Sequence, residues 1–318
     1  MSRSSLISWW QRSRYLRQVA KAIDSTVAPP PRAQPLLSGP GVVLVPFDPV
    51  HAALANPFIQ DLCQTLEGPI RLAGPVSSLR WSPETSLPPI EIPLGLSPKS
   101  FREWLEYHRA HRTDWCLLVS RSPSPLEEAC LAWLGSGARI ASLDACLSSA
   151  ANVKLQTQPE GSFELHLRRT LRTVLTGFPH GIVADRPKSG PRVLEIPPSL
   201  PETGGRTKAF VEQITRLATS QPLLLAHSEN LPELIADTVR SLGPRIALVH
   251  LQAAKDVQEL AKRSSVFVGV RSPATALAAL AGCPVRLIGA SEDALDYPSE
   301  GVQVVSLKIL RQELDESV

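Results

Sequence analysis

The sequence predicts an α/β protein that is long enough for two domains, the second of them a parallel sheet with helices on both faces, and three observations support this prediction. Residues 266–290 are typical of a strand, a helix and a second strand of a parallel sheet. Apolar strands alternate with helices from residue 193 to residue 307, and such alternation indicates a parallel sheet with helices on both faces. The chain has 318 residues, of which 43% are hydrophobic, so it is long enough for two α/β domains.

The helix within residues 266–290 has well-defined ends. Ser272 is expected to accept hydrogen bonds as its N-cap, Pro273 suits the first helical position, and Gly282 can end the helix in the left-handed conformation. In an open α/β sheet ligands bind beyond the carboxyl ends of the strands, and the start of a helix favours a phosphate. The sequence therefore predicts an anion-binding position at Ser272.

Composition and charge exclude several classes of protein. The formal charge of +3 gives no reason to expect a nucleic-acid partner. The five cysteines lack CxxC spacing and lie mostly in apolar runs, which favours a reduced, cytoplasmic protein. No apolar run is long enough for a transmembrane helix, and the N-terminus lacks the apolar core of a signal peptide. We expect no metal site, because the histidines near residue 110 lack acidic or cysteine ligands at metal-binding spacing.

Residues 1–25 are predicted to form a basic helix, followed by a proline-rich linker over residues 26–40. Paired tryptophans among basic residues suit the headgroup region of an anionic membrane, which would make the protein peripheral at the inner face of the cytoplasmic membrane. A helix packed on the protein's own body or on a partner is the alternative, and it stays open. The residues expected to make this contact are Trp9, Trp10, Arg14 and Arg17.

The remaining elements follow in two groups, over residues 41–160 and residues 161–318. In the first group we expect strands at 42–46, 70–73, 90–93, 114–120 and 138–141, with helices at 48–62, at 98–111 and up to residue 133. Residues 150–161 are expected to be irregular, and a helix at 163–175 to introduce the second domain. There we expect strands at 193–196, 223–226, 246–250, 266–270, 284–289 and 302–307, and helices at 208–218, 231–242, 254–263 and 272–282.

Residues 269–284, GVRSPATALAALAGCP, resemble a motif near the C-terminus of the ADP-heptose:lipopolysaccharide heptosyltransferase family of bacterial glycosyltransferases. Scaffold positions agree, namely Gly269, Ser272, the Leu-Ala-Ala helix face, Gly282 and Pro284. Chemical positions differ: the family's Asp is Arg271 here, its first motif Gly is Pro273 and its His is Ala276. The site motifs are therefore degenerate, while the order of elements resembles the family from residue 41 to about residue 310.

The resemblance implies a GT-B-like fold, that is, two doubly wound Rossmann-like domains facing across a cleft. It implies that the N-terminal domain binds the acceptor and that the C-terminal domain binds the donor nucleotide. No metal or other cofactor is required in the family, because helix N-termini and basic side chains handle the phosphate charge. The nucleotide sugar is a substrate, and the resemblance favours an ADP-linked one.

The resemblance also suggests roles for six residues. His51 falls where the family has the Asp that deprotonates the acceptor hydroxyl, and an imidazole could do the same work. Arg271 and Ser272 would hold the diphosphate, and Glu229 would approach the nucleotide sugar. Arg206 and Lys208 could replace the cation of the family's Lys-Arg-Trp-Pro segment, which is missing here. For each there is a structural alternative: a histidine at a helix start without catalytic duty, or a solvated or dipole-favoured residue in a first helical turn.

Two functions remain open from the sequence. The chain could be a divergent, active glycosyltransferase that moves a sugar from a nucleotide sugar to a cell-envelope glycan or lipid. It could instead be a catalytically inactive scaffold that acts as a binding or assembly module at the membrane. A third reading is an unrelated doubly wound protein with a chance match at residues 269–284, because likeness of fold does not fix function.

Overall fold

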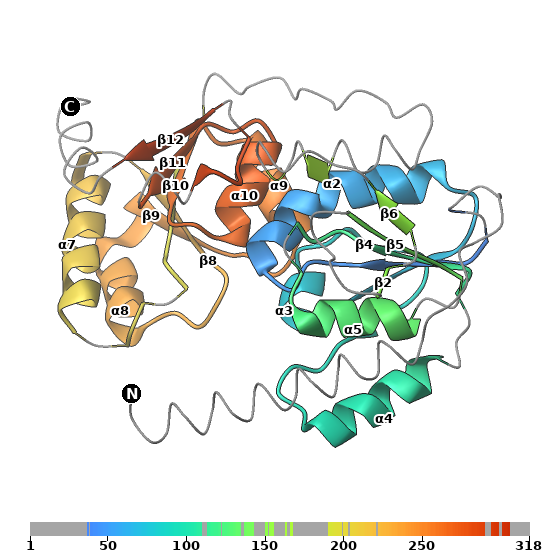
Figure 1. The fold of residues 1–318 in the computed structure, drawn as a ribbon. Helices are drawn as coiled ribbons and strands as arrows, with labels where there is room; N and C mark the ends of the chain where they lie inside the picture. The colour runs from blue at the N-terminus through green and yellow to red at the C-terminus, as the bar shows by residue number, and fades with distance from the viewer. Residues whose placement is uncertain are drawn as a thin grey trace. The chain divides into compact units, whose positions relative to one another are not determined.

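The computed structural model describes residues 37, 39–109, 113–121, 123–134, 137–142, 150–151, 153–155, 163, 166–167, 190–198, 200–202, 204–220, 222–289, 294–298 and 301–305. The chain divides into two compact units, Met1–Pro179 and His180–Val318 (Figure 1). The expected N-terminal helix, with Trp9, Trp10, Arg14 and Arg17, lies outside the described residues. Nothing among the described residues forms a helix long and apolar enough to cross a membrane.

The first unit is built on a six-stranded sheet in the order β3-β2-β1-β4-β5-β6, with all neighbouring strands parallel. Its strands are β1 Gly41–Leu44, β2 Ile70–Gly74, β3 Ile90–Glu91, β4 Trp115–Leu118, β5 Ala138–Ser142 and β6 Val153–Leu155. Strand β1 pairs with β2 on one side and with β4 on the other, so the chain winds outward in both directions from the centre. This is the doubly wound order that the sequence predicts.

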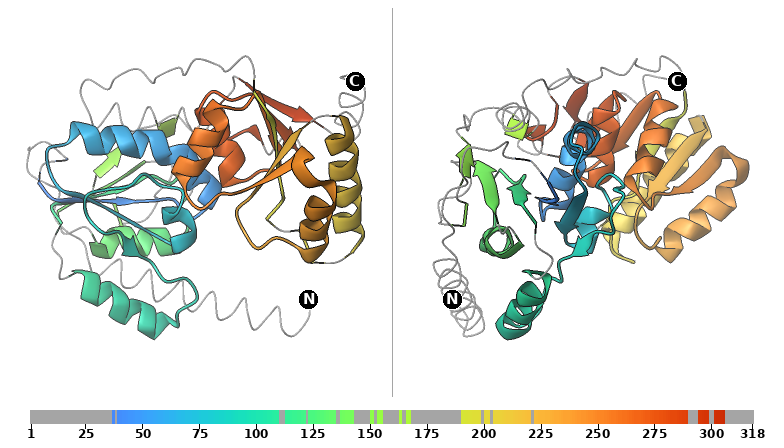
Figure 2. Two further views of the ribbon diagram at one scale, coloured as in Figure 1. Left: turned by 180° about the vertical axis from the view of Figure 1, so that it is seen from behind. Right: turned by 90° about the vertical axis from the view of Figure 1, so that its right-hand side faces the viewer.

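The helices of the first unit cover both faces of this sheet. They are α2 Pro49–Thr65, α3 Val76–Leu79, α4 Pro98–Arg109 and α5 Pro125–Leu134. Figures 1 and 2 show α2 on one face and α5 on the other. Because central parallel strands are covered on both faces, every residue of β1 and β4 is buried. The core between them combines strand and helix side chains, for example Leu44, Leu118 and Leu131.

The second unit repeats the plan with the strand order β12-β11-β10-β7-β8-β9, again all parallel. Its strands are β7 Arg192–Glu195, β8 Leu223–His227, β9 Ile246–His250, β10 Val266–Gly269, β11 Val285–Ile288 and β12 Val302–Val305. Its helices are α7 Gly205–Ser220, α8 Glu233–Leu242, α9 Ala254–Lys262 and α10 Pro273–Leu280, with a 3-10 turn at Gly243–Arg245. Helices α7 and α8 pack together on one face of the sheet, and α9 and α10 pack together on the other (Figure 1).

Most expected elements are confirmed within a few residues, and two are corrected. Residues 150–161 were expected to be irregular, but β6 forms there and pairs with β5 through Val153 and Ile140. An edge strand of three residues has one neighbour only, so its sequence needs little apolar character. The stretch between β2 and β3, for which the sequence predicts no helix, contains the short helix α3.

The beginning of the expected helix at 163–175 belongs to the first unit. Phe163, His166 and Leu167 are helical and buried, and the division between the units falls after Pro179, beyond the expected boundary at residue 160. The rest of that helix lies outside the described residues. The ring of Phe163 therefore contributes to the surroundings of residues in the first unit.

Candidate functional site

Each sheet has one point where the strand order reverses, and the chemistry-bearing side chains gather there. In the second unit the reversal lies between β7 and β10, and in the first between β1 and β4. Ligands of open α/β sheets bind beyond the carboxyl ends of the strands at such points. The loops that follow these four strands are therefore the candidate sites.

The start of α10, which follows β10, is enclosed by the protein's own side chains. Ser272 is the N-cap: its Oγ accepts from the Thr275 amide at 3.1 Å, and its own amide donates to Thr275 Oγ1 at 3.1 Å. The hydroxyl of Tyr297 lies 2.8 Å from Thr275 Oγ1 and 3.3 Å from the Ser272 amide. All three side chains are at most 2% exposed. The predicted N-cap is thus present, but the hydroxyl groups of Ser272, Thr275 and Tyr297 are engaged within the chain.

Glu195, the last residue of β7, reaches into the same cluster. Its Oε2 accepts a hydrogen bond from Ser272 Oγ at 2.8 Å, and the residue is 1% exposed. Its Oε1 has no hydrogen-bond partner in the described part of the chain. Burial raises the pKa of Glu195 to about 8, although the bond from Ser272 lowers it. A carboxyl group held mostly neutral at pH 7 therefore lies beside the start of α10.

Gly269, at the end of β10, makes room for this carboxyl group. A Cβ at Gly269 would come within 2.4 Å of Glu195 Oε2 and within 2.8 Å of Thr275 Cγ2. A glycine at a switch point allows a ligand to approach the backbone closely. Here the space is taken by Glu195. Glu195 could not be predicted from the sequence, because nothing local to β7 indicates its contact with α10.

Arg271 lies next to Ser272, and its charge is matched from within the second unit. Its Nη2 is 3.5 Å from Asp296 Oδ2, with side chains 30% and 25% exposed. The guanidinium is thus near the start of α10, as the predicted diphosphate contact requires. An anionic ligand would compete with Asp296 for it. The predicted role of Arg271 stays a prediction.

The other residues predicted to contact the donor are exposed. Glu229 follows β8, and its carbonyl oxygen lies 2.8 Å from Nδ1 of His227. Arg206 and Lys208 lie in the first turn of α7. Their proposed contacts with a nucleotide sugar also stay predictions.

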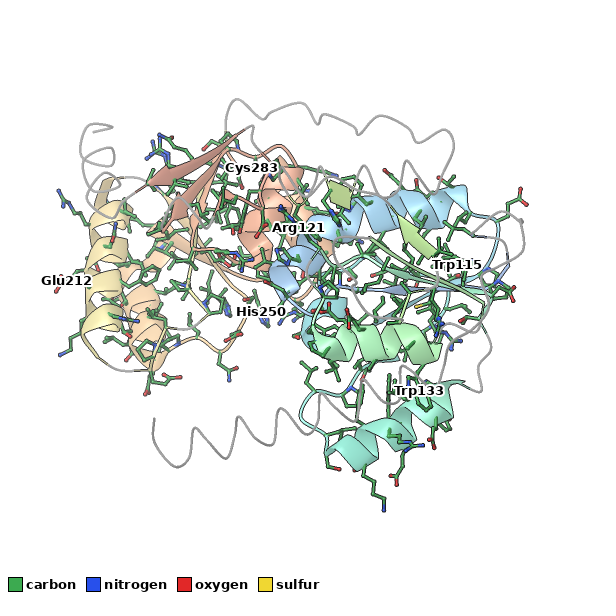
Figure 3. The ribbon with its side chains drawn as sticks, viewed as in Figure 1. Trp115, Arg121, Trp133, Glu212, His250 and Cys283 are labelled. Atoms are coloured by element: carbon green, nitrogen blue, oxygen red, sulfur yellow. The ribbon has the colours of Figure 1, made fainter. Side chains whose placement is uncertain are left out.

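A histidine pair lies at the same carboxyl edge of the second sheet. The rings of His227 and His250 stack with centroids 4.7 Å apart and planes at 11°, because β8 and β9 pair in register at these residues. Figure 3 labels His250. The pair was not predicted from the sequence, although both strands end in histidine. Among the described residues no group of three or more His, Cys, Asp and Glu side chains is arranged to hold a metal ion.

In the first unit, His51 lies in the first turn of α2, just beyond β1. Its Nδ1 is 3.8 Å from Asp48 Oδ2, and its ring stacks on Phe163 with centroids 4.6 Å apart. Asp48 is also the N-cap of α2, accepting from the Val50 amide at 2.8 Å. The His51 side chain is 25% exposed, so it is held by its neighbours yet accessible to solvent. A half-buried histidine beside a carboxylate suits a general base.

A buried carboxylate joins the loops at the switch point of the first sheet. Glu127, in the first turn of α5, accepts from the Phe47 amide at 3.0 Å, from the Ser124 amide at 2.6 Å and from the Ser120 hydroxyl. It is 4% exposed. Ser124 and Glu127 have the spacing of a capping box, a local signal from which Glu127 could have been predicted. The contacts with Phe47 and Ser120 fix the loops after β1 and β4.

Comparisons with known proteins give no match among protein-family models and none among curated proteins. Solved structures do match. Escherichia coli heptosyltransferase WaaC with ADP-2-deoxy-2-fluoro heptose is similar over 88% of this chain and 100% of its own, with a TM-score of 0.61 and 13% identity. A glycosyl transferase family 9 structure from Veillonella parvula DSM 2008 is similar over 90% of each chain, with a TM-score of 0.62 and 10% identity.

A third structure, E. coli ADP-heptose lps heptosyltransferase II, is similar over 83% of this chain and 89% of its own, with a TM-score of 0.54 and 14% identity. At these identities the likeness concerns the fold. It confirms the α/β, GT-B-like architecture of two doubly wound Rossmann-like domains. The resemblance to the heptosyltransferase family read from residues 269–284 is confirmed at this level.

Proposed function

We propose that the chain is a divergent glycosyltransferase of the heptosyltransferase type, which transfers a sugar from a nucleotide sugar to a cell-envelope glycan or lipid acceptor. The single observation that carries the proposal is the placement of His51. It lies at the carboxyl edge of the first sheet, beside Asp48 and against Phe163, where the family resemblance expects a base. The fold shared with WaaC over that protein's full length supports the same reading.

In the proposed reaction, His51 takes the proton from an acceptor hydroxyl while the hydroxyl oxygen attacks the anomeric carbon of the donor. The bond between that carbon and the diphosphate oxygen breaks, and the nucleoside diphosphate leaves with the electron pair. Because attack and departure occur on opposite faces of the sugar, the configuration inverts. Asp48, 3.8 Å from His51 Nδ1, orients the imidazole and stabilises its positive charge after proton transfer.

The donor would be bound by the second unit. Arg271 and Ser272 at the start of α10, Glu229 after β8, and Arg206 and Lys208 in α7 are the proposed contacts, and an ADP-linked sugar is the donor that the resemblance favours. Arg271 would exchange Asp296 for phosphate, because a guanidinium binds phosphate as well as carboxylate. We propose a protein peripheral to the inner face of the cytoplasmic membrane, with residues 1–25 as the membrane contact.

An inactive scaffold is the second candidate, and the enclosed start of α10 favours it. Ser272, Thr275 and Tyr297 satisfy one another there, so the fold is kept while the expected phosphate position is filled. Such a protein would use the same two units to bind or assemble partners at the membrane. It would keep its fold in a variant without the His51 imidazole. Neither the wild type nor that variant would turn over a donor.

A donor screen separates the two candidates. The full chain is incubated with ADP-, UDP- and GDP-linked sugars and envelope glycolipid, and the released nucleoside diphosphate is measured. Release should fall by about 10²- to 10⁴-fold in His51→Ala, the range expected for losing a general base. Tyr107→Ala, which removes an exposed side chain of α4, is the control and should release as the wild type does. If the wild type releases nothing from any donor, the scaffold is the better description.

A further inference from the structure

We propose that Glu195 determines which ligand groups can occupy the start of α10, because its carboxyl group fills the position that a phosphate would take there. This inference rests on the proposed function, since it concerns how the donor is held. It revises one of the donor contacts proposed above: Ser272 and the first turn of α10 do not hold the donor diphosphate in this chain, because the Ser272 hydroxyl is bonded to Glu195. The exposed basic residues of the second unit would hold it instead.

The geometry of three residues supports the proposal. Glu195 Oε2 accepts the hydroxyl hydrogen of the N-cap residue Ser272 at 2.8 Å. The same oxygen lies where a Cβ on Gly269 would approach within 2.4 Å. The carboxyl group therefore occupies the space between the end of β10 and the start of α10. A group placed against the backbone at Gly269 would therefore overlap the carboxyl group of Glu195.

The unpaired oxygen of Glu195 is an independent indication that this is a ligand position. Its Oε1 is buried and has no hydrogen-bond partner among the described residues. Leaving a buried polar atom without a hydrogen-bond partner costs about 1–3 kcal/mol, so its presence calls for an explanation. A core built only for stability would carry an apolar side chain at this place. A carboxyl group here is suited to keep anions away.

Both protonation states of Glu195 exclude a phosphate. The neutral acid excludes it by volume, because the cluster of Ser272, Thr275 and Tyr297 is buried around it. The ionised form adds repulsion between two negative charges at close range in a buried site. The charged and titratable groups of this cluster are Glu195, Tyr297, Arg271 and Asp296. Because the positive charge of Arg271 already interacts with Asp296, it offsets only part of the repulsion between ionised Glu195 and a phosphate.

The proposal predicts that shortening Glu195 creates an anion-binding position. Glu195→Ala should bind ADP and inorganic pyrophosphate at least about tenfold more tightly than the wild type, a change of about 1.4 kcal/mol. Glu195→Gln should bind as the wild type does, because an amide fills the same volume. A gain in affinity cannot arise from misfolding, so the test does not depend on equal stability of the variants.

Calorimetric titration of the full chain measures these affinities. The matched control is Glu212→Ala, which removes an exposed carboxylate from α7 and so tests the change of net charge alone (Figure 3). The control should bind as the wild type does. Equal, measurable affinity for ADP in the wild type and in Glu195→Ala would overturn the inference and leave the proposed function standing. An equal gain in Glu195→Gln and Glu195→Ala would also overturn it, and absence of binding by every variant would overturn both.

Discussion

The carboxyl group of Glu195 accepts a hydrogen bond from the hydroxyl of Ser272 at 2.8 Å, although the two residues are 77 positions apart in the chain. The bond joins the end of β7 to the start of α10, which are neighbours only because the strand order reverses between β7 and β10. This hydrogen bond thus connects β7 and α10 at the switch point of the second sheet. Its energetic role can be tested separately from any ligand.

Ser272→Ala should destabilise the second unit by about 1–3 kcal/mol. The substitution removes the N-cap oxygen of α10 and leaves Glu195 Oε2 without its donor. Unfolding of the second unit can be followed by far-UV circular dichroism. Tryptophan fluorescence reports on the first unit alone, because the last of the six tryptophans is Trp133. A shift of the fluorescence transition without a shift in dichroism would contradict the prediction.

The stability of the second unit should depend on pH through Glu195. Its pKa of about 8 in the folded protein lies above the ordinary value of 4.5, so folding favours the protonated form. The stabilisation is complete below about pH 4.5 and is lost as the pH rises to about 8. The pKa of Tyr297 is raised by burial to about 12, so Tyr297 keeps its proton throughout this window.

The experiment for this pH dependence compares wild type with Glu195→Gln, which cannot titrate. Urea unfolding followed by dichroism should show that the free energy of unfolding of the wild type falls, relative to that of Glu195→Gln, between about pH 5 and about pH 8. Above that range the difference should stay level. A difference independent of pH over the whole window would show that Glu195 titrates normally.

Glu127→Ala should destabilise the first unit by about 2–4 kcal/mol. The change leaves the Phe47 amide, the Ser124 amide and the Ser120 hydroxyl without their shared acceptor. Urea unfolding followed by tryptophan fluorescence measures the effect. Glu128→Ala, at the neighbouring and less buried position, is the matched control and should cost less than about 1 kcal/mol. Equal effects of the two substitutions would refute the role of Glu127 in fixing the loops after β1 and β4.

Asp48→Asn should lower the rate of sugar transfer by about tenfold and leave the substrate KM unchanged. Asparagine can still cap α2, but it cannot stabilise the charge that His51 acquires on taking a proton. Steady-state kinetics with the best donor from the screen separates kcat from KM. A rise in KM at constant kcat would place Asp48 in substrate binding instead.

The architecture could be predicted because it depends on local patterns. Strand and helix periodicity, the N-cap at Ser272 and the alternation of elements are visible within short windows, and the structure confirms them. Strand β6 could not be predicted, because three edge residues carry too little pattern. The place of Phe163 beside His51 could not either, since it depends on packing between segments distant in sequence.

The candidate site was predictable only in part. Ser272 was identified from local capping signals and His51 from the family resemblance, and they lie at the switch points of the two sheets. Glu195 and Glu127 were not, because each acts through contacts made after the sheet has formed. The pairing of His227 with His250 required the register of β8 and β9. Long-range contacts of this kind decide whether the protein's own side chains occupy the space at a switch point.

The most direct test of the proposed function is the detection of the transferred sugar itself. The full chain is incubated with an ADP-linked sugar and envelope glycolipid, and the lipid fraction is analysed by mass spectrometry. The account predicts a product heavier by one sugar residue with the wild type and its loss with His51→Ala. An unchanged lipid fraction with every donor tested, from wild-type protein that is folded by dichroism, would contradict the account and leave the scaffold in its place.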